Sequence, residues 1–345
     1  MTGGAWQPDS DPGVAARRAE LLQNAHLFFR DRNILAVDTP ALSARTVTDP
    51  NIASITAVAA HRPTLYLQTS PEHFMKRLLA AGYPDIYQIC KVFRDGEHGR
   101  NHLTEFTMIE WYRLKFGLQE IMQDAIDLVT TLLTRERISA DARFISYADA
   151  FQSVLSINPF TADIELLAKS ACADTNLKSA LGEDRDAWLD LLLASKVTDG
   201  FASDRLTVLH HYPASQAALS RHCPENKDLA DRFELFYGKV ELANGYVELT
   251  DADEQLDRCK RDQKLRGEQG LPVPEIDENL IAALRAGLPP CAGVAVGFDR
   301  LFMINEDTDN IQSTSSFTLG NLYLFVNSYL GSKISSFGVA NLRNG

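Results

Sequence analysis

Two β-rich runs at residues 86–94 and 106–114 constrain the fold most strongly, because the polar loop 95–105 joins them directly. Runs of this composition on either side of a short polar loop predict a long antiparallel hairpin. Further elements are expected as strands at 34–39, 207–211 and within 233–249, and as amphipathic helices at 14–32 and 118–135. The sequence therefore predicts an α+β fold with a mainly antiparallel sheet.

Composition and charge exclude several classes of protein. The 345 residues are 45% apolar and 23% charged, which is typical of a globular protein and excludes a disordered chain, a collagen and a coiled coil. The net charge of −12 argues against nucleic acid as the main partner, because a polyanion would be repelled. The five cysteines are scattered without a C-x-x-C pair, and neither a membrane span nor a signal peptide is recognisable. These features predict a cytoplasmic protein that does not bind membranes.

The remaining segments add helices and a tail. Ser70, Pro71 and Glu72 are typical of a helix start, and the helix is expected to continue to Gly82. Residues 141–204 are expected to form short amphipathic helices without recognisable chemistry. Residues 305–345 are rich in Ser, Thr and Asn and follow no periodicity, so the sequence leaves their order open.

The dipeptide Asn244-Gly245 lies between two runs of alternating apolar residues, which is a strong signal for a two-residue hairpin turn. In that register Glu241 would face Glu248. Carboxylates placed opposite each other repel unless a cation lies between them. The pair is therefore either exposed to water or a magnesium site with oxygen ligands.

A row of side chains on the second strand of the long hairpin is a candidate binding surface. Phe106, Met108, Glu110 and Tyr112 alternate along this strand and project from the same face. Such a row could stack a base and bind an amine, although a half-buried strand with polar ends has the same pattern. Arg94, at the end of the partner strand, is either a surface cation or a phosphate ligand.

Residues 293–301 predict a strand that passes through a glycine into a helix. A position without a side chain lets a ligand approach the backbone, and Gly297 supplies one. Arg300 lies in the first helical turn, where a cation has the wrong sign for the helix dipole. This placement indicates an anion that the arginine holds.

Together these segments resemble the three signature motifs of class II aminoacyl-tRNA synthetases, and specifically those of the lysyl branch. The first helix, the strand after it and Pro40 are similar to motif 1, VFRDGEHGRNHLTEFTMIEWYR (residues 92–113) to motif 2, and GVAVGFDRL (residues 293–301) to motif 3. TSPE (69–72) and ELANGYVEL (241–249) are further matches. The chain leaves no room for the domain that reads the anticodon, and it is similar to the truncated lysyl paralogues that attach (R)-β-lysine to a lysine of elongation factor P. Residues 6–8 (WQP) and 212–219 (YPASQAAL) also resemble that family.

This resemblance implies a fold, a reaction and partners. A class II catalytic domain would span residues 1–304, followed by an atypical tail at 305–345. The enzyme would use ATP and Mg²⁺ to form an aminoacyl-adenylate and then transfer (R)-β-lysine to elongation factor P. The family also implies a homodimer formed through motif 1 and no stable binding of tRNA. Two alternatives remain open: a lysine-activating enzyme with another acceptor, and a catalytically silent paralogue.

The resemblance also assigns roles to individual residues. Arg94 would hold the α-phosphate, Phe106 would stack on adenine, and Arg300 would cover its other face and reach the γ-phosphate. Glu241 and Glu248 would hold magnesium. ATP contacts are also expected at Asp95, Gly96, Leu242 and Gly297. Substrate contacts are expected at Ser70, Pro71, Glu72, Glu110, Tyr112, Glu248 and Ala295.

Four positions depart from the lysyl pattern, one of them Thr104, which replaces a Pro. Gly96 and Leu103 stand where lysyl synthetases carry Glu and Asn, which predicts fewer hydrogen bonds to adenine. In a regular strand Glu97 would face the wrong side to compensate, so only a bulge or a rearranged loop would bring it to the nucleotide. Ala295 replaces a Gly and would narrow the amino-acid pocket, as in the paralogue family.

Overall fold

The computed structural model describes residues 7–58, 63–133 and 141–317 of the chain. Trp6 and residues 318–345 of the predicted tail lie outside this part.

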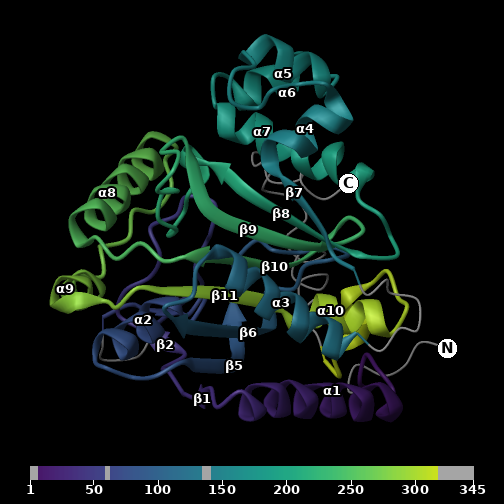
Figure 1. Ribbon diagram of the computed structural model, residues 1–345, viewed down its shortest axis with the longest axis vertical. Helices are drawn as coiled ribbons and strands as arrows, with labels where there is room; N and C mark the ends of the chain where they lie inside the picture. The colour runs from purple at the N-terminus through teal and green to yellow at the C-terminus, as the bar shows by residue number, and fades with distance from the viewer. Residues whose placement is uncertain (1–6, 59–62, 134–140, 318–345) are drawn as a thin grey trace.

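Eight of the described strands form a central sheet (Figure 1) in the spatial order β1-β5-β6-β11-β10-β9-β8-β7. These are β1 (Leu35–Ala36), β5 (Ile86–Phe93), β6 (Glu105–Leu114), β7 (Arg143–Ser146), β8 (Leu206–Pro213), β9 (Leu229–Tyr237), β10 (Val240–Val247) and β11 (Cys291–Gly297). Strand β1 pairs with β5 in parallel, and β7 pairs with β8 in parallel, whereas every neighbouring pair between them is antiparallel. The predicted mainly antiparallel sheet and the long β5–β6 hairpin are confirmed.

A small second sheet and the helices surround this centre. The small sheet consists of β2 (Leu42–Ser43), β4 (Leu65–Leu67) and β3 (Thr56–Ala57). The helices are α1 (Pro12–Asp31), α2 (Glu72–Ala80), α3 (Leu118–Leu132), α4 (Tyr147–Leu155), α5 (Ile164–Ser170), α6 (Thr175–Leu181), α7 (Arg185–Ser195), α8 (Ala252–Glu268), α9 (Glu278–Gly287) and α10 (Phe298–Asn305). Among the described residues, no helix has both the length and the apolar character that crossing a membrane requires.

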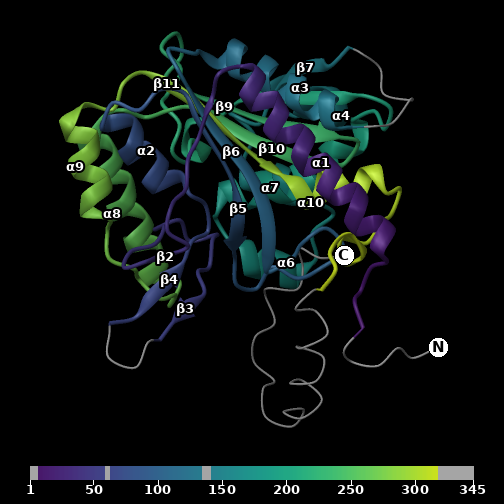
Figure 2. The same cartoon turned by 90° about the horizontal axis from the view of Figure 1, so that it is seen from below.

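One face of the central sheet is apolar and carries the main core. Ile109 and Trp111 of β6 and Val294 of β11 are fully or almost fully buried there, together with residues of α1, α3 and α10. Figure 2 shows α1 lying across this part of the molecule. Because side chains alternate along a strand, the residues between these positions project from the opposite face. That opposite face carries the candidate site.

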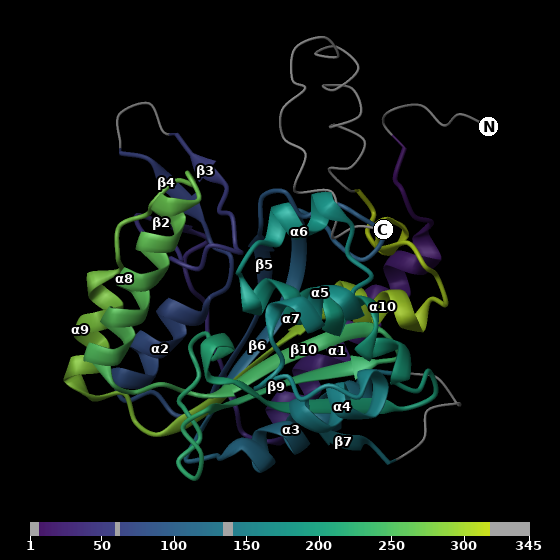
Figure 3. The ribbon, with the colours of Figure 1, turned by 90° about the horizontal axis from the view of Figure 1, so that it is seen from above.

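Two smaller cores fix the edges of this face. Helices α4 to α7 enclose a core around Trp188 and Phe151 next to β8 and β9. On the other side α2 and α9 pack together through Met75, Leu79 and Leu284, and α8 lies beside α9 (Figure 3). The latter group brings α2 against the ends of β5, β6 and β11.

The predicted turn at Asn244-Gly245 is wrong. Both residues lie inside β10 and pair with β9 on one side and with β11 on the other. The actual turn is Gly238-Lys239, since Tyr237 pairs with Val240. Gly238 has a φ of +55°, a conformation that glycine adopts readily and that two-residue hairpin turns use.

The beginning of the predicted tail is packed. After α10 the chain forms a short 3₁₀ turn at Ile311–Thr314, whose two terminal residues are buried. The Ile311 amide donates to the Arg100 carbonyl, and the Asp9 amide donates to the Ser316 carbonyl. Residues up to 317 therefore belong to the folded body.

Candidate active site

Two rows of side chains cross the polar face of the sheet. Cα pairing aligns the first row as Glu110 of β6, Ala295 of β11, Asn244 of β10 and Glu234 of β9. It aligns the second row as Tyr112, Gly293, Tyr246 and Arg232 of the same strands. The predicted alternation of Glu110 and Tyr112 on one face agrees with these pairs.

An acidic pocket lies where this face meets α2. The Tyr112 hydroxyl donates to Glu110 Oε1 at 2.8 Å. Lys76 Nζ of α2 lies 2.5 Å from Glu72 Oε1 and 2.6 Å from Glu248 Oε2. All five residues are at most 9% exposed. The pocket thus holds three carboxylates around a single ammonium group among its described residues.

The burial of these charges shifts their pKa values. Burial, and then the neighbouring Glu72 carboxylate, raises the pKa of Glu110 to about 8. Burial raises the pKa of Glu248 to about 7, although Lys76 opposes this. The Lys76 pKa is raised above its ordinary value because its two carboxylate neighbours outweigh its own burial. The ammonium group therefore stays charged, whereas Glu110 and Glu248 hold their protons to higher pH than ordinary glutamates.

Gly293 is required by close packing in this pocket. A Cβ atom at this position would lie 2.4 Å from Tyr112 Cε1 and 2.6 Å from Glu248 Oε1. Any side chain would therefore push apart the tyrosine and the glutamate. At Ala295, two residues further on, a side chain is tolerated and is partly exposed.

A second group of side chains lies towards the β5–β6 loop. The Arg94 guanidinium lies 5.3 Å from the centre of the Phe106 ring and 3.5 Å from Glu97 Oε1. Arg300 Nη1 donates to the Glu241 carbonyl at 3.1 Å and lies 3.5 Å from Glu241 Oε2. Arg300 Nε also donates to the Asn101 carbonyl of the β5–β6 loop at 3.1 Å. Two arginines, an aromatic ring and a carboxylate thus occupy one end of the polar face.

Comparisons with known proteins agree with this geometry. Residues 13–320 match the model of the class II tRNA synthetases (D, K and N). The chain belongs to this family. The elongation factor P (R)-β-lysine ligase of Photorhabdus laumondii is 42% identical over 320 residues, which cover 91% of this chain and 97% of that protein. The ligases of the same name from Hamiltonella defensa and Avibacterium paragallinarum are 41% and 40% identical, over 90% and 92% of this chain and 97% and 98% of theirs.

Membership of the class II family implies use of ATP, and the motif residues lie together as the resemblance implied. Motif 1 is tied to motif 3, because Arg18 of α1 lies 2.6 Å from Asp299 Oδ1 of α10. The other oxygen of Asp299 accepts from the Thr107 amide of motif 2 at 2.5 Å. All three motifs thus meet at one end of the sheet.

The predicted register that faces Glu241 with Glu248 is wrong, whereas the magnesium pair itself stays a prediction. Both residues belong to the same run of chain, seven positions apart in sequence, which corresponds to roughly 20 Å along a strand. Glu248 is held by Lys76, whereas Glu241 lies beside Arg300. The false hairpin turn caused this error.

Glu234 is a site residue that sequence reasoning missed. It lies on β9 opposite Asn244, and its pKa is raised to about 7 by burial and then by the nearby Glu241 carboxylate. Glu241 reaches this face because the β9–β10 register shifts between Glu241 and Ala243, which turns Leu242 into the apolar core. Correct placement of the hairpin turn would have paired these strands and brought the two glutamates together.

The β5–β6 loop departs from the regular strand on which the prediction about Glu97 depended. Residues 94–104 leave the regular strands, and Glu97 lies near Arg94 rather than on the opposite face. Glu97 also raises the pKa of His102, although burial and Arg300 lower it overall. Gly96 has a φ of +75°, so a glutamate at this position would be strained.

The positions of the remaining predicted site residues say less about a ligand. Ser70 Oγ accepts from the Glu72 amide at 3.3 Å, and Pro71 is the N-cap of α2. Asp95 Oδ1 accepts from the Gly96 amide at 2.9 Å. The side chain of Leu242 is buried in the main core, which leaves its backbone for a ligand, and a Cβ at Gly297 would meet no atom closer than 3.8 Å.

Proposed function

We propose that this protein is an ATP-dependent, AMP-forming ligase that activates (R)-β-lysine and transfers it to a lysine side chain of translation elongation factor P. The names of its relatives support this assignment. The polar face of the sheet supplies an acidic pocket and, next to it, a pair of arginines suited to a nucleotide.

The observation that carries the proposal is that one carboxylate oxygen of Glu110 lacks a partner within the residues that the structure describes. Its Oε2 atom is buried and has no hydrogen-bond partner in the described part of the chain. When the three carboxyl groups of Glu110, Glu72 and Glu248 are ionised, their charge exceeds that of Lys76. A substrate with two ammonium groups supplies both the missing donors and the missing positive charge. Tyr112 donates a hydrogen bond to Glu110 and thereby orients this carboxylate towards the amines of the substrate.

The nucleotide is assigned to the arginine end of the face. Arg94 Nε is buried and unbonded among the described residues, so it can donate to the α-phosphate. Phe106 stacks on adenine and Arg300 closes over it towards the γ-phosphate. Glu97, which lies 3.5 Å from Arg94, is our candidate acceptor for the adenine amine in place of the side chains that Gly96 and Leu103 lack.

The reaction needs charge neutralisation and alignment more than an acid or base. The substrate carboxylate oxygen bonds to the α-phosphorus of ATP, and the bond to the pyrophosphate oxygen breaks. The uncharged lysine amine of elongation factor P then attacks the carbonyl of the adenylate, and AMP leaves as the amide forms. Arg94 and Arg300 stabilise the negative charge that develops on the phosphates.

We assign Mg²⁺ to the oxygen donors of Glu241 and Glu234, which also pair with Arg300 at 3.5 Å and with Arg232 at 2.6 Å. Their carboxylates are close enough to raise the pKa of Glu234, and oxygen donors are what this ion prefers. Bound there, Mg²⁺ would neutralise phosphate charge. Glu248 remains a substrate-pocket residue in this assignment.

We also assign the protein to the cytoplasm as a homodimer without stable tRNA binding. The resemblance to motif 1 supports the dimer, and Leu35 and Leu42, in the segment around it, are 44% and 45% exposed. Apolar side chains exposed in this way are available to a second copy of the chain.

The proposal is tested by exchange of radiolabelled pyrophosphate into ATP. Exchange should depend on (R)-β-lysine and fall by roughly 100-fold or more in Glu110→Gln, because removing one partner of a buried charge pair costs about 3–5 kcal/mol. Glu268→Gln, at an exposed position of α8, is the control and should behave like the unmodified protein. Exchange that is absent with (R)-β-lysine, or that is unaffected in Glu110→Gln, would contradict the proposal.

A further inference from the structure

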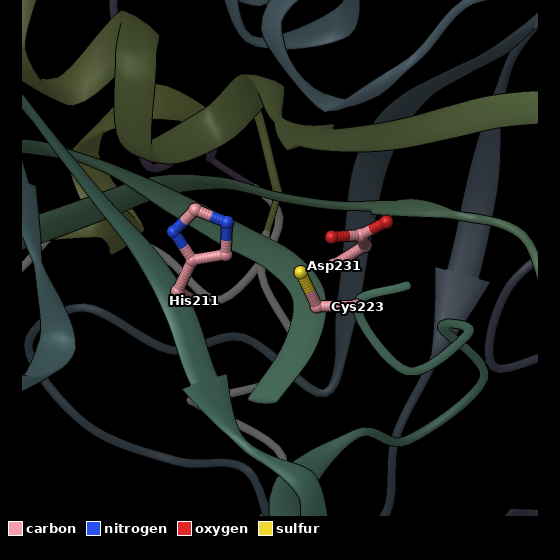
Figure 4. A group of neighbouring side chains, drawn as sticks. All are labelled: His211, Cys223 and Asp231. Atoms are coloured by element: carbon pink, nitrogen blue, oxygen red, sulfur yellow. The ribbon is translucent and has the colours of Figure 1, made fainter. Parts of the chain in front are cut away.

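Three potential metal ligands converge away from the candidate active site. His211 of β8, Cys223 of the loop between β8 and β9, and Asp231 of β9 each offer an atom within 4.8 Å of the other two (Figure 4). Cys223 and Asp231 are buried and His211 is partly exposed. We propose that these residues form a site for a divalent transition metal, with Zn²⁺ as the best match.

A local distortion of β8 points His211 into this group. The register between β8 and β9 shifts between His210 and Tyr212, and His211 has a φ of +58°. Few residues other than glycine adopt this conformation, and bulges of this kind commonly re-aim a side chain. Figure 4 shows the ring nitrogen remote from the main chain, Nε2, turned towards Cys223 and Asp231.

Neighbouring residues hold the ligands in the orientation that a metal requires. His211 Nδ1 lies 2.7 Å from His210 Nδ1, so a hydrogen bond there leaves Nε2 free to bind metal. Arg221 Nε donates to Asp231 Oδ2 at 2.8 Å and leaves the other oxygen available. Outer hydrogen bonds of this kind orient metal-binding histidines and carboxylates.

The three donor atoms of His211, Cys223 and Asp231 indicate which metal would bind. A sulfur, an imidazole nitrogen and a carboxylate oxygen are the ligands of zinc sites, whereas Mg²⁺ and Ca²⁺ prefer oxygen alone. The thiolate and the carboxylate bring two negative charges to a divalent ion, and Arg221 is ion-paired with the carboxylate. Cys223 Sγ donates to Glu225 Oε2 at 3.1 Å, so Glu225 is placed to accept the thiol proton or to supply a fourth ligand.

The ion would also have a route into the site. His211 lines a cavity of about 720 Å³ whose wall includes Ser146 from the end of β7, Pro213 from β8 and Asn226 from the Cys223 loop. An ion bound at its edge would join β8, β9 and the Cys223 loop. The site is built from segments next to the α4–α7 group, and it shares no residue with the proposed ligase site.

Cobalt(II) is the appropriate probe, because it replaces zinc in such sites and absorbs when a thiolate binds it. Titration of the unmodified protein should give a sulfur-to-cobalt absorption band that saturates at one ion per chain and disappears on addition of Zn²⁺. Cys223→Ser should abolish the band. Cys172→Ser, which changes an exposed cysteine, is the matched control and should keep it.

His211→Gln and Asp231→Asn retain the thiol and test the geometry should the serine variant fail to fold. Each should weaken cobalt binding by more than the roughly 10–100-fold that loss of an outer hydrogen bond costs. No sulfur band in the folded protein would overturn the proposal, as would a band that survives in Cys223→Ser or unchanged affinity in both His211→Gln and Asp231→Asn. Since the readout is metal binding, it is independent of whether the protein is a ligase.

Discussion

Two opposing effects act on the pKa of Glu110. Burial and the negative charge of Glu72 raise its pKa to about 8, whereas the hydrogen bond from Tyr112 favours the ionised form. In the ligand-free protein near neutral pH, a large fraction of Glu110 is therefore protonated. A bound ammonium group reverses this balance, because it stabilises the carboxylate.

The affinity for (R)-β-lysine should therefore rise with pH. Between about pH 6 and 8 binding requires Glu110 to lose its proton, so the dissociation constant should fall and then level off above the Glu110 pKa. Calorimetry in buffers of different ionisation enthalpy should detect the released proton. Glu110→Gln should remove the part of the pH dependence due to this group. A dissociation constant that is constant over this range in the unmodified protein would contradict the account.

Gly293→Ala should distort the acidic pocket by steric overlap, without any change of charge. The added Cβ would displace Tyr112 and Glu248, and overpacking of this kind costs about 1–3 kcal/mol of unfolding free energy. The KM for (R)-β-lysine should rise more than the KM for ATP, since the arginine end of the face is untouched. Gly267→Ala is the control, because no atom lies within 4 Å of its Cβ position in α8. This change should leave kinetics unaltered and stabilise the helix slightly, by up to about 1 kcal/mol. Equal effects of the two substitutions on the KM for (R)-β-lysine would exclude the proposed packing role.

Single residues were predictable where strand periodicity decides their direction. Alternation in β6 was enough to place Glu110 and Tyr112 on one face. Lys76 and Glu234 were missed, because their roles depend on contacts between segments that lie far apart in the sequence or across a misplaced turn. Neither has a local signal stronger than an ordinary charged residue.

At the scale of elements, Asn244-Gly245 shows how a local signal can fail. Gly245 is present because a Cβ there would lie 2.4 Å from the Phe233 ring, so the glycine serves packing rather than a turn. The pairing of β10 on both sides outweighs the turn preference of the dipeptide. Elements with strong periodicity, such as α1 and the β5–β6 hairpin, were predicted within a few residues.

Hydrogen exchange can locate the turn directly. Amides of residues 243–247 lie in the interior of β10 between two paired strands, so they should exchange slowly. The amides of Gly238 and Lys239, at the actual turn, should exchange much faster. Fast exchange at Asn244 and Gly245 with slow exchange at Gly238 would support the turn that the sequence alone predicts.

At the scale of the whole molecule, one face of the central sheet packs the core and the other face carries the candidate site. One face packs against α1, α3 and α10, while the other presents the acidic pocket at one end and the arginines at the other. The family motifs made this division predictable. The metal-ligand group at His211 was not, because it depends on a bulge and on a loop whose sequence shows no recognisable motif.

The central claim is transfer of (R)-β-lysine to elongation factor P, and the mass of the intact acceptor tests it most directly. Incubation of the protein with ATP, Mg²⁺, (R)-β-lysine and unmodified elongation factor P should add the mass of one β-lysyl residue at a single lysine. The product should be absent when ATP is omitted and strongly reduced with Glu110→Gln. An acceptor of unchanged mass, under conditions in which pyrophosphate exchange proceeds, would contradict the account and indicate a different acceptor.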